Sequence, residues 1–351
     1  MSRHGSPDWI TSSIESIFRD IDRSLTAAGA SAGLRGVRPM GAFPCSLVAS
    51  IQCRQCGGAL AIAVGAELTA NELGVRRGRL CCTSCGDSTN VSAGIVLSGA
   101  GEGDLALHDE SRHEQQLRDA RARSTTGDAD DPRWNSEYQL MEILSALAAL
   151  DIHPGDAILE LGCGDGRYTT RLAPRCASLL AIDLSLESLA VLDRRLRGAG
   201  NVGLVHADVT TLRVPSRRFD VVYSTLTSNL PTREHRQAMY RVAADALRSD
   251  GRFVFSAHHQ GIMQWLSGES KSGRYAQGHI YRYNFALREC VNEVRPYFAS
   301  VRAWPIQIRV PFAKRIGLPT VELSRRLERV PVVNRLGDLI LCVAQAPLAA
   351  G

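Results

Sequence analysis

The chain has 351 residues, 44% of them hydrophobic, and a formal net charge of +5. This length predicts two units, and the apolar fraction excludes global disorder. No apolar run approaches the roughly 18 to 20 residues of a membrane span, and the N-terminus lacks the pattern of a signal peptide. We therefore expect no membrane span and a cytoplasmic protein, whose ten Cys are reduced, bind metal or pack in the core.

Residues 1–43 are predicted to form an amphipathic helix and an Ala- and Gly-rich loop. Ser6-Pro7-Asp8 is a suitable helix start, and apolar residues recur at helical spacing from Ile10 to Leu25. The stripe favours a helix packed on the body of the protein. The alternatives are a helix that covers the substrate and one that forms a homodimer.

Residues 44–100 contain two C-x-x-C pairs, each followed by Gly, as in the two knuckles of a zinc ribbon. The predicted ligands are Cys53, Cys56, Cys82 and Cys85. Cys81 could compete with Cys82, and a redox pair or unligated thiols are the alternatives. Four thiolates leave no open coordination position, so we expect a structural Zn²⁺. A hairpin loop at 66–79 absorbs the long spacing, and a strand at 91–98 closes the ribbon.

Residues 101–135 are charged and polar, and they are predicted to connect the ribbon to the rest of the chain. An acidic start and a basic end predict a helix over 108–123. A solvated linker is the favoured interpretation, and a partial lid is the alternative.

Residues 136–351 are predicted to form one α/β domain, because strands alternate with helices along the chain. The predicted strands are 157–161, 178–182, 202–206, 219–223, 252–257, 300–309 and 336–344. The predicted helices are 136–150, 186–196, 233–247 and 285–294. Residues 310–335 form an insertion. A surface helix is the default interpretation of this insertion, with a lid over the acceptor or an amphipathic membrane-facing patch as alternatives.

The first strand of this domain runs into glycines at 162, 164 and 166, after which a helix begins. Such a loop lets backbone approach a ligand. The third glycine comes one residue earlier than in the dinucleotide fingerprint, and Glu160 would repel a pyrophosphate. The pattern suits a ligand without phosphates and with a cationic end. It resembles the first motif of class I S-adenosylmethionine-dependent methyltransferases.

This resemblance covers roughly residues 136–345 and implies a doubly wound, mostly parallel seven-stranded sheet that ends in an antiparallel hairpin. It also implies S-adenosylmethionine as the cofactor. Glu160 would meet its amino group, Asp183 its ribose, Leu184 its adenine ring, and Asp208 with Val209 the adenine amino group. The implied cofactor residues are Glu160, Gly162, Cys163, Gly164, Gly166, Asp183, Leu184, Asp208, Val209 and Ser224.

Methyl transfer needs mainly alignment, and a base only if the nucleophile carries a proton. The candidate bases are His258 and His259 after the fifth strand, of which at most one faces the cleft; polar loop residues are the alternative. The Asn/Asp-Pro-Pro-Tyr signature of amide and exocyclic-amine methyltransferases is absent, which favours O- or C-methylation. The predicted acceptor residues are Tyr223, Asn229, Tyr281, Arg282 and Tyr283.

The favoured function is methyl transfer to a small molecule, for example in secondary metabolism. The alternative is an RNA methyltransferase that grips ribosomal RNA with the ribbon, but the ribbon carries only four Arg without interleaved aromatics. A third interpretation is a non-catalytic partner that kept the fold.

Overall fold

The computed structural model describes residues 41–99, 109–124, 136–196, 199–226, 229–275 and 280–348. The predicted N-terminal helix, and with it the homodimer alternative, lies outside these residues. Among them, no helix combines the length and the apolarity needed to cross a bilayer.

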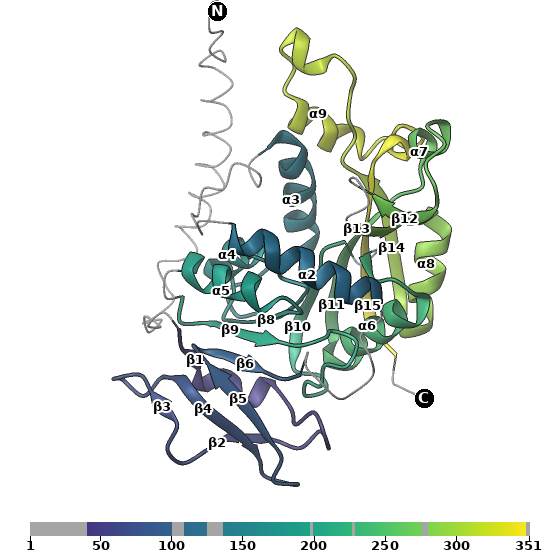
Figure 1. The fold of residues 1–351 in the computed structure, drawn as a ribbon. Helices are drawn as coiled ribbons and strands as arrows, with labels where there is room; N and C mark the ends of the chain where they lie inside the picture. The colour runs from purple at the N-terminus through teal and green to yellow at the C-terminus, as the bar shows by residue number, and fades with distance from the viewer. Residues whose placement is uncertain are drawn as a thin grey trace, which may run out of the picture.

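A doubly wound sheet forms the centre of the molecule (Figure 1). Its seven strands are β7 (Ala157–Leu161), β8 (Ser178–Asp183), β9 (Val202–His206), β10 (Phe219–Ser224), β11 (Leu247–His258), β14 (Phe298–Ile306) and β15 (Leu339–Pro347). Their order is β9-β8-β7-β10-β11-β15-β14. The first five strands are parallel, and β15 and β14 are antiparallel. The predicted fold class is confirmed.

Helices cover both faces of this sheet because its strands alternate between two apolar clusters. On β7, Ile158 belongs to the cluster that includes α3 (Glu137–Leu150), α4 (Thr169–Leu172) and α5 (Leu186–Arg195). The neighbouring Leu159 belongs to the cluster that includes α6 (Arg233–Ala246) and α8 (Leu287–Val294). The short 3-10 turns η2 (Ala173–Arg175) and η4 (Arg295–Tyr297) follow α4 and α8.

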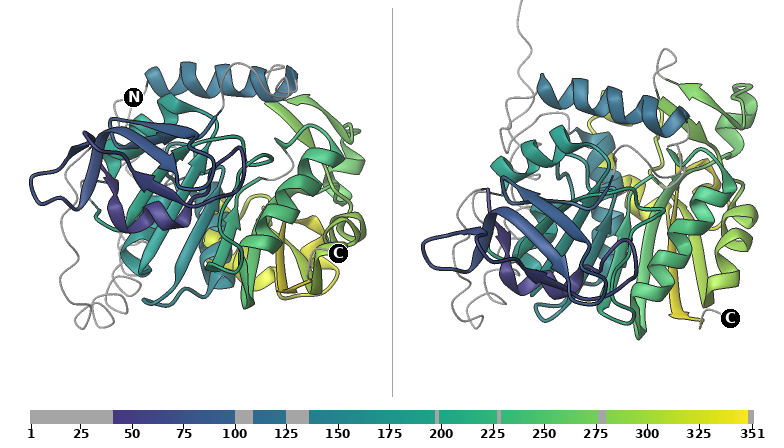
Figure 2. Two further views of the ribbon diagram at one scale, coloured as in Figure 1. Left: turned by 90° about the horizontal axis from the view of Figure 1, so that it is seen from below. Right: turned by 60° about the horizontal axis from the view of Figure 1, so that its bottom comes forward.

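The Cys-rich unit is joined to this sheet as a continuation of it. Its elements are β1 (Phe43–Pro44), η1 (Cys45–Ser50), β2 (Leu60–Ile62), β3 (Glu67–Leu68), β4 (Gly74–Cys82), β5 (Ser88–Ser92) and β6 (Ile95–Leu97). The last of them, β6, pairs in parallel with β9 and so covers the edge of the methyltransferase-like sheet. Figure 2 shows the unit lying against that edge.

Two predictions for the Cys-rich unit were wrong in detail. The single strand predicted at 91–98 is a hairpin of β5 and β6, because Ala93 and Gly94 both take positive φ and reverse the chain. The loop predicted at 66–79 is shorter, because β4 already begins at Gly74. Its nine residues pair with β1, β2, β3 and β5.

The unit also shares its core with the sheet. Phe43 and Leu47 are buried against β9, where Gly203 leaves room for them. A Cβ on Gly203 would lie 2.7 Å from Phe43 Cε2 and 3.0 Å from Leu47 Cδ1. The absence of a side chain at this strand position therefore permits the close approach of the Cys-rich unit.

The C-terminal part adds elements beyond the alternating pattern. These are α7 (Ile262–Leu266), the hairpin of β12 (Ser272–Tyr275) and β13 (Ile280–Tyr283), and, in the insertion, η5 (Ala313–Ile316), α9 (Thr320–Leu327) and η6 (Val333–Leu336). The strand predicted at 300–309 ends at Ile306, since Gln307 has a φ of +64°. The next strand begins at Leu339 because Gly337 crosses closely over the backbone of Ile306.

Candidate functional site

The loop after β7 has three glycines, all with positive φ. A Cβ on Gly162 or Gly164 would meet no atom within 4 Å, whereas one on Gly166 would lie 2.2 Å from Leu192 Cδ1 on α5. Gly162 and Gly164 thus leave open space that a ligand can fill, and Gly166 allows the loop to pack on α5.

Two of the predicted acids lie at the carboxyl ends of β8 and β9, next to this loop. Asp183 accepts hydrogen bonds from the backbone N–H groups of Gly164 at 2.6 Å and of Ser185 at 2.8 Å. Burial raises the pKa of Asp183. Asp208 accepts from the backbone and the hydroxyl of Thr210 through one oxygen, Oδ1, at 2.8 and 2.7 Å. These bonds hold both carboxylates in fixed orientations at the edge of the sheet.

Glu160 is the third predicted acid, and it is almost completely buried on β7. Its Oε2 accepts a hydrogen bond of 2.7 Å from the Thr169 hydroxyl. Burial raises the pKa of Glu160 to about 8, although the Thr169 hydroxyl opposes that shift. The carboxyl is therefore mostly protonated at neutral pH, and a cation placed beside it would favour the ionised form.

A cavity of about 570 Å³ opens above the carboxyl ends of β7 to β11. This is where ligands bind in open α/β sheets, at the point where the strand order reverses between β7 and β10. Nine of the ten predicted cofactor residues line it, namely Glu160, Gly162, Cys163, Gly164, Asp183, Leu184, Asp208, Val209 and Ser224. Gly166 does not line the cavity.

The residues present fit S-adenosylmethionine. The cavity combines two glycines without side chains, a buried carboxyl for a cationic group, and carboxylates on successive strands. Ser224 donates to the Leu161 carbonyl at 2.8 Å and so joins β10 to β7 beneath the cavity. Individual contacts to the cofactor stay predictions.

Helix α2 (Asp109–Arg123), predicted at 108–123, lies across one end of the sheet in Figures 1 and 2. Six of its residues line the cavity. Its Gln115 side chain donates to the Leu184 carbonyl at 3.0 Å, and its Asp119 accepts from the Ser185 hydroxyl at 2.5 Å. Its Arg118 forms an ion pair of 2.9 Å with Glu114 at the cavity wall. The helix thereby closes over the segment that follows β8.

The cavity is chemically divided. Its five acidic lining residues, Glu114, Glu160, Asp165, Asp183 and Asp208, all come from α2 or from the part around β7 to β9. The lining residues from β10 onward contain no carboxylate. They are Ser224, Thr225, Leu226, Asn229, Leu230, His235, Met239, His258, Ile280 and Arg282. Arg118, Arg121 and Arg167 line the cavity among these acids. The end from β10 onward has no carboxylate of its own and therefore suits a neutral or anionic group.

Of the two candidate bases, His258 lines the cavity and His259 does not. The His259 Nδ1 lies 2.8 Å from the carbonyl oxygen of Gly337, on the far side of the strand end. Burial, reinforced by the positive charge of Arg282, lowers the pKa of His258 to about 3. His258 is thus neutral at physiological pH and a weak base.

The five predicted acceptor residues separate into two groups. Asn229 and Arg282 line the cavity. Tyr223 is fully buried and packs against Tyr168, with ring centroids 4.8 Å apart. Tyr281 and Tyr283 are half-buried on β13 and do not line the cavity.

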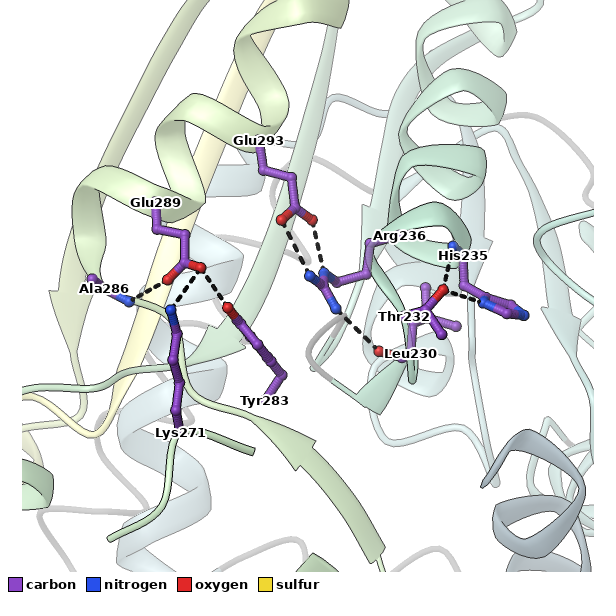
Figure 3. Close-up of polar contacts among 9 residues, drawn as sticks. All are labelled: Leu230, Thr232, His235, Arg236, Lys271, Tyr283, Ala286, Glu289 and Glu293. Carbon is purple, nitrogen blue, oxygen red and sulfur yellow. Dashed lines mark hydrogen bonds and ion pairs between the residues drawn. The ribbon is translucent and has the colours of Figure 1, made fainter. Parts of the chain in front are cut away.

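We call the cavity wall formed by the lining residues from β10 onward the acceptor-side wall. Arg236 connects this wall to the rest of the domain, as Figure 3 shows. Its guanidinium donates to both carboxylate oxygens of Glu293 on α8, at 2.7 and 3.2 Å, and to the Leu230 carbonyl at 3.4 Å. It also lies 4.6 Å from the ring centroid of Tyr283. The preceding residue, His235, lines the cavity and lies 2.7 Å from the Thr232 hydroxyl.

A second contact group in Figure 3 fixes the β12–β13 hairpin to α8. The Glu289 carboxylate accepts hydrogen bonds from the Tyr283 hydroxyl and from Lys271, the latter at 2.9 Å. It also accepts from the backbone of Ala286 at 3.3 Å. Tyr283 thus supports the hairpin that carries Arg282.

Sequence reasoning missed another cavity residue, Arg167. It forms an ion pair of 2.9 Å with the buried Glu142 of α3, which also accepts from the Ser256 hydroxyl on β11. This network fixes the glycine loop to β11 through Glu142. An Arg directly after the third glycine was the available signal, but its partner comes from a distant helix.

The four predicted metal ligands lie together. The sulfurs of Cys53, Cys56, Cys82 and Cys85 are all within 4.8 Å of one another, and Cys81 lies outside this cluster. Backbone N–H groups donate to the sulfur atoms of Cys56 at 3.3 Å and of Cys82 at 3.4 Å. Donation from the backbone of Cys85 and Ser84 lowers the pKa of Cys82 to about 6, which favours its thiolate. The donor set fits a tetrahedral Zn²⁺, whose ~2.3 Å bonds would place sulfurs ~3.8 Å apart.

Residues 158–251 match the protein family described as "Methyltransferase domain". Malonyl-[acyl-carrier protein] O-methyltransferase of Marinomonas sp. is 31% identical over 154 residues, which are 42% of this chain and 54% of that protein. Ribosomal RNA small subunit methyltransferase A of Geobacter metallireducens is 40% identical over 68 residues, 19% of this chain and 25% of that protein. The chain thus spans about half or less of these relatives' length.

The structure of the DhpI-SAM-HEP complex is similar to this chain over 69% of it and 100% of DhpI, with 15% identity and a TM-score of 0.47. The order of the strands and the family match of residues 158–251 indicate the same fold. The chain has the fold of the class I S-adenosylmethionine-dependent methyltransferases and contains a methyltransferase domain, as its first motif predicted.

Proposed function

We propose that this chain transfers the methyl group of S-adenosylmethionine to an anionic oxygen of a small acceptor, using its methyltransferase domain. The distribution of carboxylates in the cavity carries this proposal, because the wall formed by the lining residues from β10 onward contributes none of its own. Glu114 of α2 reaches this wall, where Asn229 donates to it at 3.5 Å. Arg282 is the charged side chain of that wall, and it also forms an ion pair with Glu269. The sulfonium of the cofactor supplies an electrophilic methyl group and leaves with the bonding electron pair as a neutral thioether.

An anionic acceptor also agrees with the state of His258. A histidine with a pKa of about 3 is too weak a base to remove a proton from an alcohol or an amine efficiently. A carboxylate oxygen needs no deprotonation. Its lone pair forms the new O–C bond, the negative charge is lost, and a methyl ester results. The protein then has to hold the oxygen in line and exclude water.

The relative from Marinomonas supports this choice, since its name describes an O-methyltransferase of a malonyl group, which carries a free carboxylate. The RNA alternative has less support, since the ribosomal RNA methyltransferase of Geobacter metallireducens matches only 68 residues, 19% of this chain. The Cys-rich unit lies beyond β9, with β9, β8 and β7 between it and β10. RNA held there would be separated from the acceptor wall.

The test uses pairs of acceptors that differ only in charge, such as a carboxylic acid and its amide, with methyl-labelled cofactor. Label should enter the acid and not the amide. Arg282→Gln should raise the KM for the acid by about tenfold, because a charged hydrogen bond contributes about 1.5–3 kcal/mol.

Arg274→Gln, on the neighbouring strand of the same hairpin and outside the cavity lining, is the matched control. Equal methylation of acid and amide would contradict the anionic acceptor. Labelling of RNA with a steep negative salt dependence would support the RNA alternative instead.

We further propose that the four thiolates hold a structural Zn²⁺ and that the protein works in the cytoplasm, where thiols stay reduced. None of the ten cysteines forms a disulfide. The metal would fix the two knuckles that position β4, and thereby the hairpin of β5 and β6 on the edge strand β9.

A further inference from the structure

Figure 1 places α7 and α9 at the end of the molecule away from the Cys-rich unit. The surface at this end is both apolar and basic. We call the surface formed by α7 and residues 309–336 the apolar–basic face. Of the sixteen large apolar side chains that are exposed in the described residues, ten lie on this face. They are Ile262, Met263, Trp265, Leu266, Phe312, Ile316, Leu318, Val330, Val332 and Leu336.

The exposure of these side chains is large. Trp265 is 73% exposed, Ile316 71%, Val332 68% and Phe312 67%. Monomeric soluble proteins rarely leave such groups clustered, and a cluster of them indicates a surface that meets a partner or a membrane. Most of them are carried on short helices and turns.

Positive charge accompanies the apolar side chains. Residues 309–336 contain seven basic and two acidic residues, a net charge of +5 that equals the net charge of the whole chain. One of the two acids, Glu328, is buried and accepts hydrogen bonds from Ser145 and from the backbone of Gln307. The other, Glu322, pairs with Arg326. Arg309 and Lys314 pair with Asp338 and Glu137, which lie outside this segment, so the positive charge that the face presents is smaller than +5.

The two parts of the face are joined to each other and to the cavity. Asp338 accepts from Gln264 of α7 at 2.9 Å and pairs with Arg309 at 2.7 Å. Lys314 pairs with Glu137 at the start of α3, two residues before Gln139, which lines the cavity. Helix α3 thus contacts this face at its start and contributes Gln139 to the cavity lining.

We propose that the apolar–basic face docks the protein on an anionic membrane surface. Protruding Trp, Phe, Leu and Ile side chains would enter the boundary between headgroups and acyl chains, while the surrounding Arg and Lys bind anionic headgroups. Docking would bring the cavity to an amphiphilic acceptor held in the membrane. This consequence rests on the proposed function. Neither part alone suffices, since stable binding takes both apolar and electrostatic contributions.

Sedimentation with vesicles tests the docking without cofactor or acceptor, so its failure is separate from a failure of methyl transfer. The protein should bind vesicles of phosphatidylcholine with phosphatidylglycerol, bind phosphatidylcholine alone weakly, and lose affinity as salt increases. Arg315→Glu combined with Arg329→Glu should lower the partition coefficient by about 25-fold or more, as each basic residue contributes about fivefold. Arg77→Glu combined with Arg79→Glu, exposed on β4, is the matched control and should have little effect.

Trp265 provides a second readout. Brominated lipids should quench its fluorescence, and Trp265→Phe should remove the quenched component while retaining vesicle binding. Absence of binding to anionic vesicles at low salt, or equal loss in the β4 control, would overturn the proposal. The proposal would also be overturned if the protein formed a dimer that Trp265→Ser dissociates. Saturable binding to an acyl carrier protein without binding to vesicles would overturn it as well.

Discussion

The ion pair between Arg236 and Glu293 allows a sharp test of how the acceptor-side wall is held. Both side chains are almost completely buried, with 4% and 5% exposure, and two hydrogen bonds join them. Glu293→Gln or Arg236→Met would leave a charged partner buried without compensation. Such a loss typically costs about 3–5 kcal/mol of stability.

The chain contains a matched control on its surface. Arg326 and Glu322 on α9 also pair through Nε, at 2.8 Å compared with 2.7 Å in the buried pair, but their side chains are 75% and 41% exposed. Arg326→Met should cost no more than about 1 kcal/mol. The Nε–oxygen distances are nearly equal, and the buried pair has a second hydrogen bond in addition, so burial and that bond distinguish the two pairs.

Urea unfolding of the single variants and of Arg236→Met with Glu293→Leu provides the assay. The double variant should be more stable than either single variant, because no unpaired charge stays buried. Since Arg236 also donates to Leu230, its loss should raise the acceptor KM and leave cofactor affinity unchanged. A Glu293→Gln cost below about 1 kcal/mol, equal to the surface control, would refute this reasoning.

Four further predictions follow from the site and the sheet. The pKa of Glu160 is about 8 in the folded protein and 4.5 ordinarily, so the folded state binds one more proton than the unfolded state between these pH values. The free energy of unfolding should therefore fall as pH rises through that window, by up to about 1.4 kcal/mol per pH unit. Glu160→Gln should remove this slope in unfolding measured against pH. Asp183→Ala should weaken cofactor binding at least about tenfold by calorimetry, through loss of a charged acceptor; unchanged affinity would remove its assignment. Gly203→Ala should destabilise the protein by about 1–3 kcal/mol, and Phe43→Leu should restore part of this loss in the double variant. Cys53→Ser should abolish zinc in metal analysis and lower the thermal midpoint; a normal midpoint would contradict a structural metal.

Local sequence patterns determined much of this protein. The glycine loop, the acids after successive strands and the paired Cys knuckles each occupy a few consecutive residues, whose backbone conformation and spacing are locally dictated. The strand and helix alternation determined the parallel sheet for the same reason. These features predicted the fold, nine cavity-lining residues and the cluster of four thiols.

Only the tertiary structure decided which distant groups meet. The pairing of β6 with β9 joins segments about a hundred residues apart, and no local pattern specifies an edge partner. The choice between His258 and His259 depends on where the strand end turns toward Gly337. The buried pair of Arg236 and Glu293 reads in the sequence as two ordinary surface charges. Such contacts arise from packing between elements, so the acceptor-side wall and the exposure of the apolar–basic face became visible only in the folded chain.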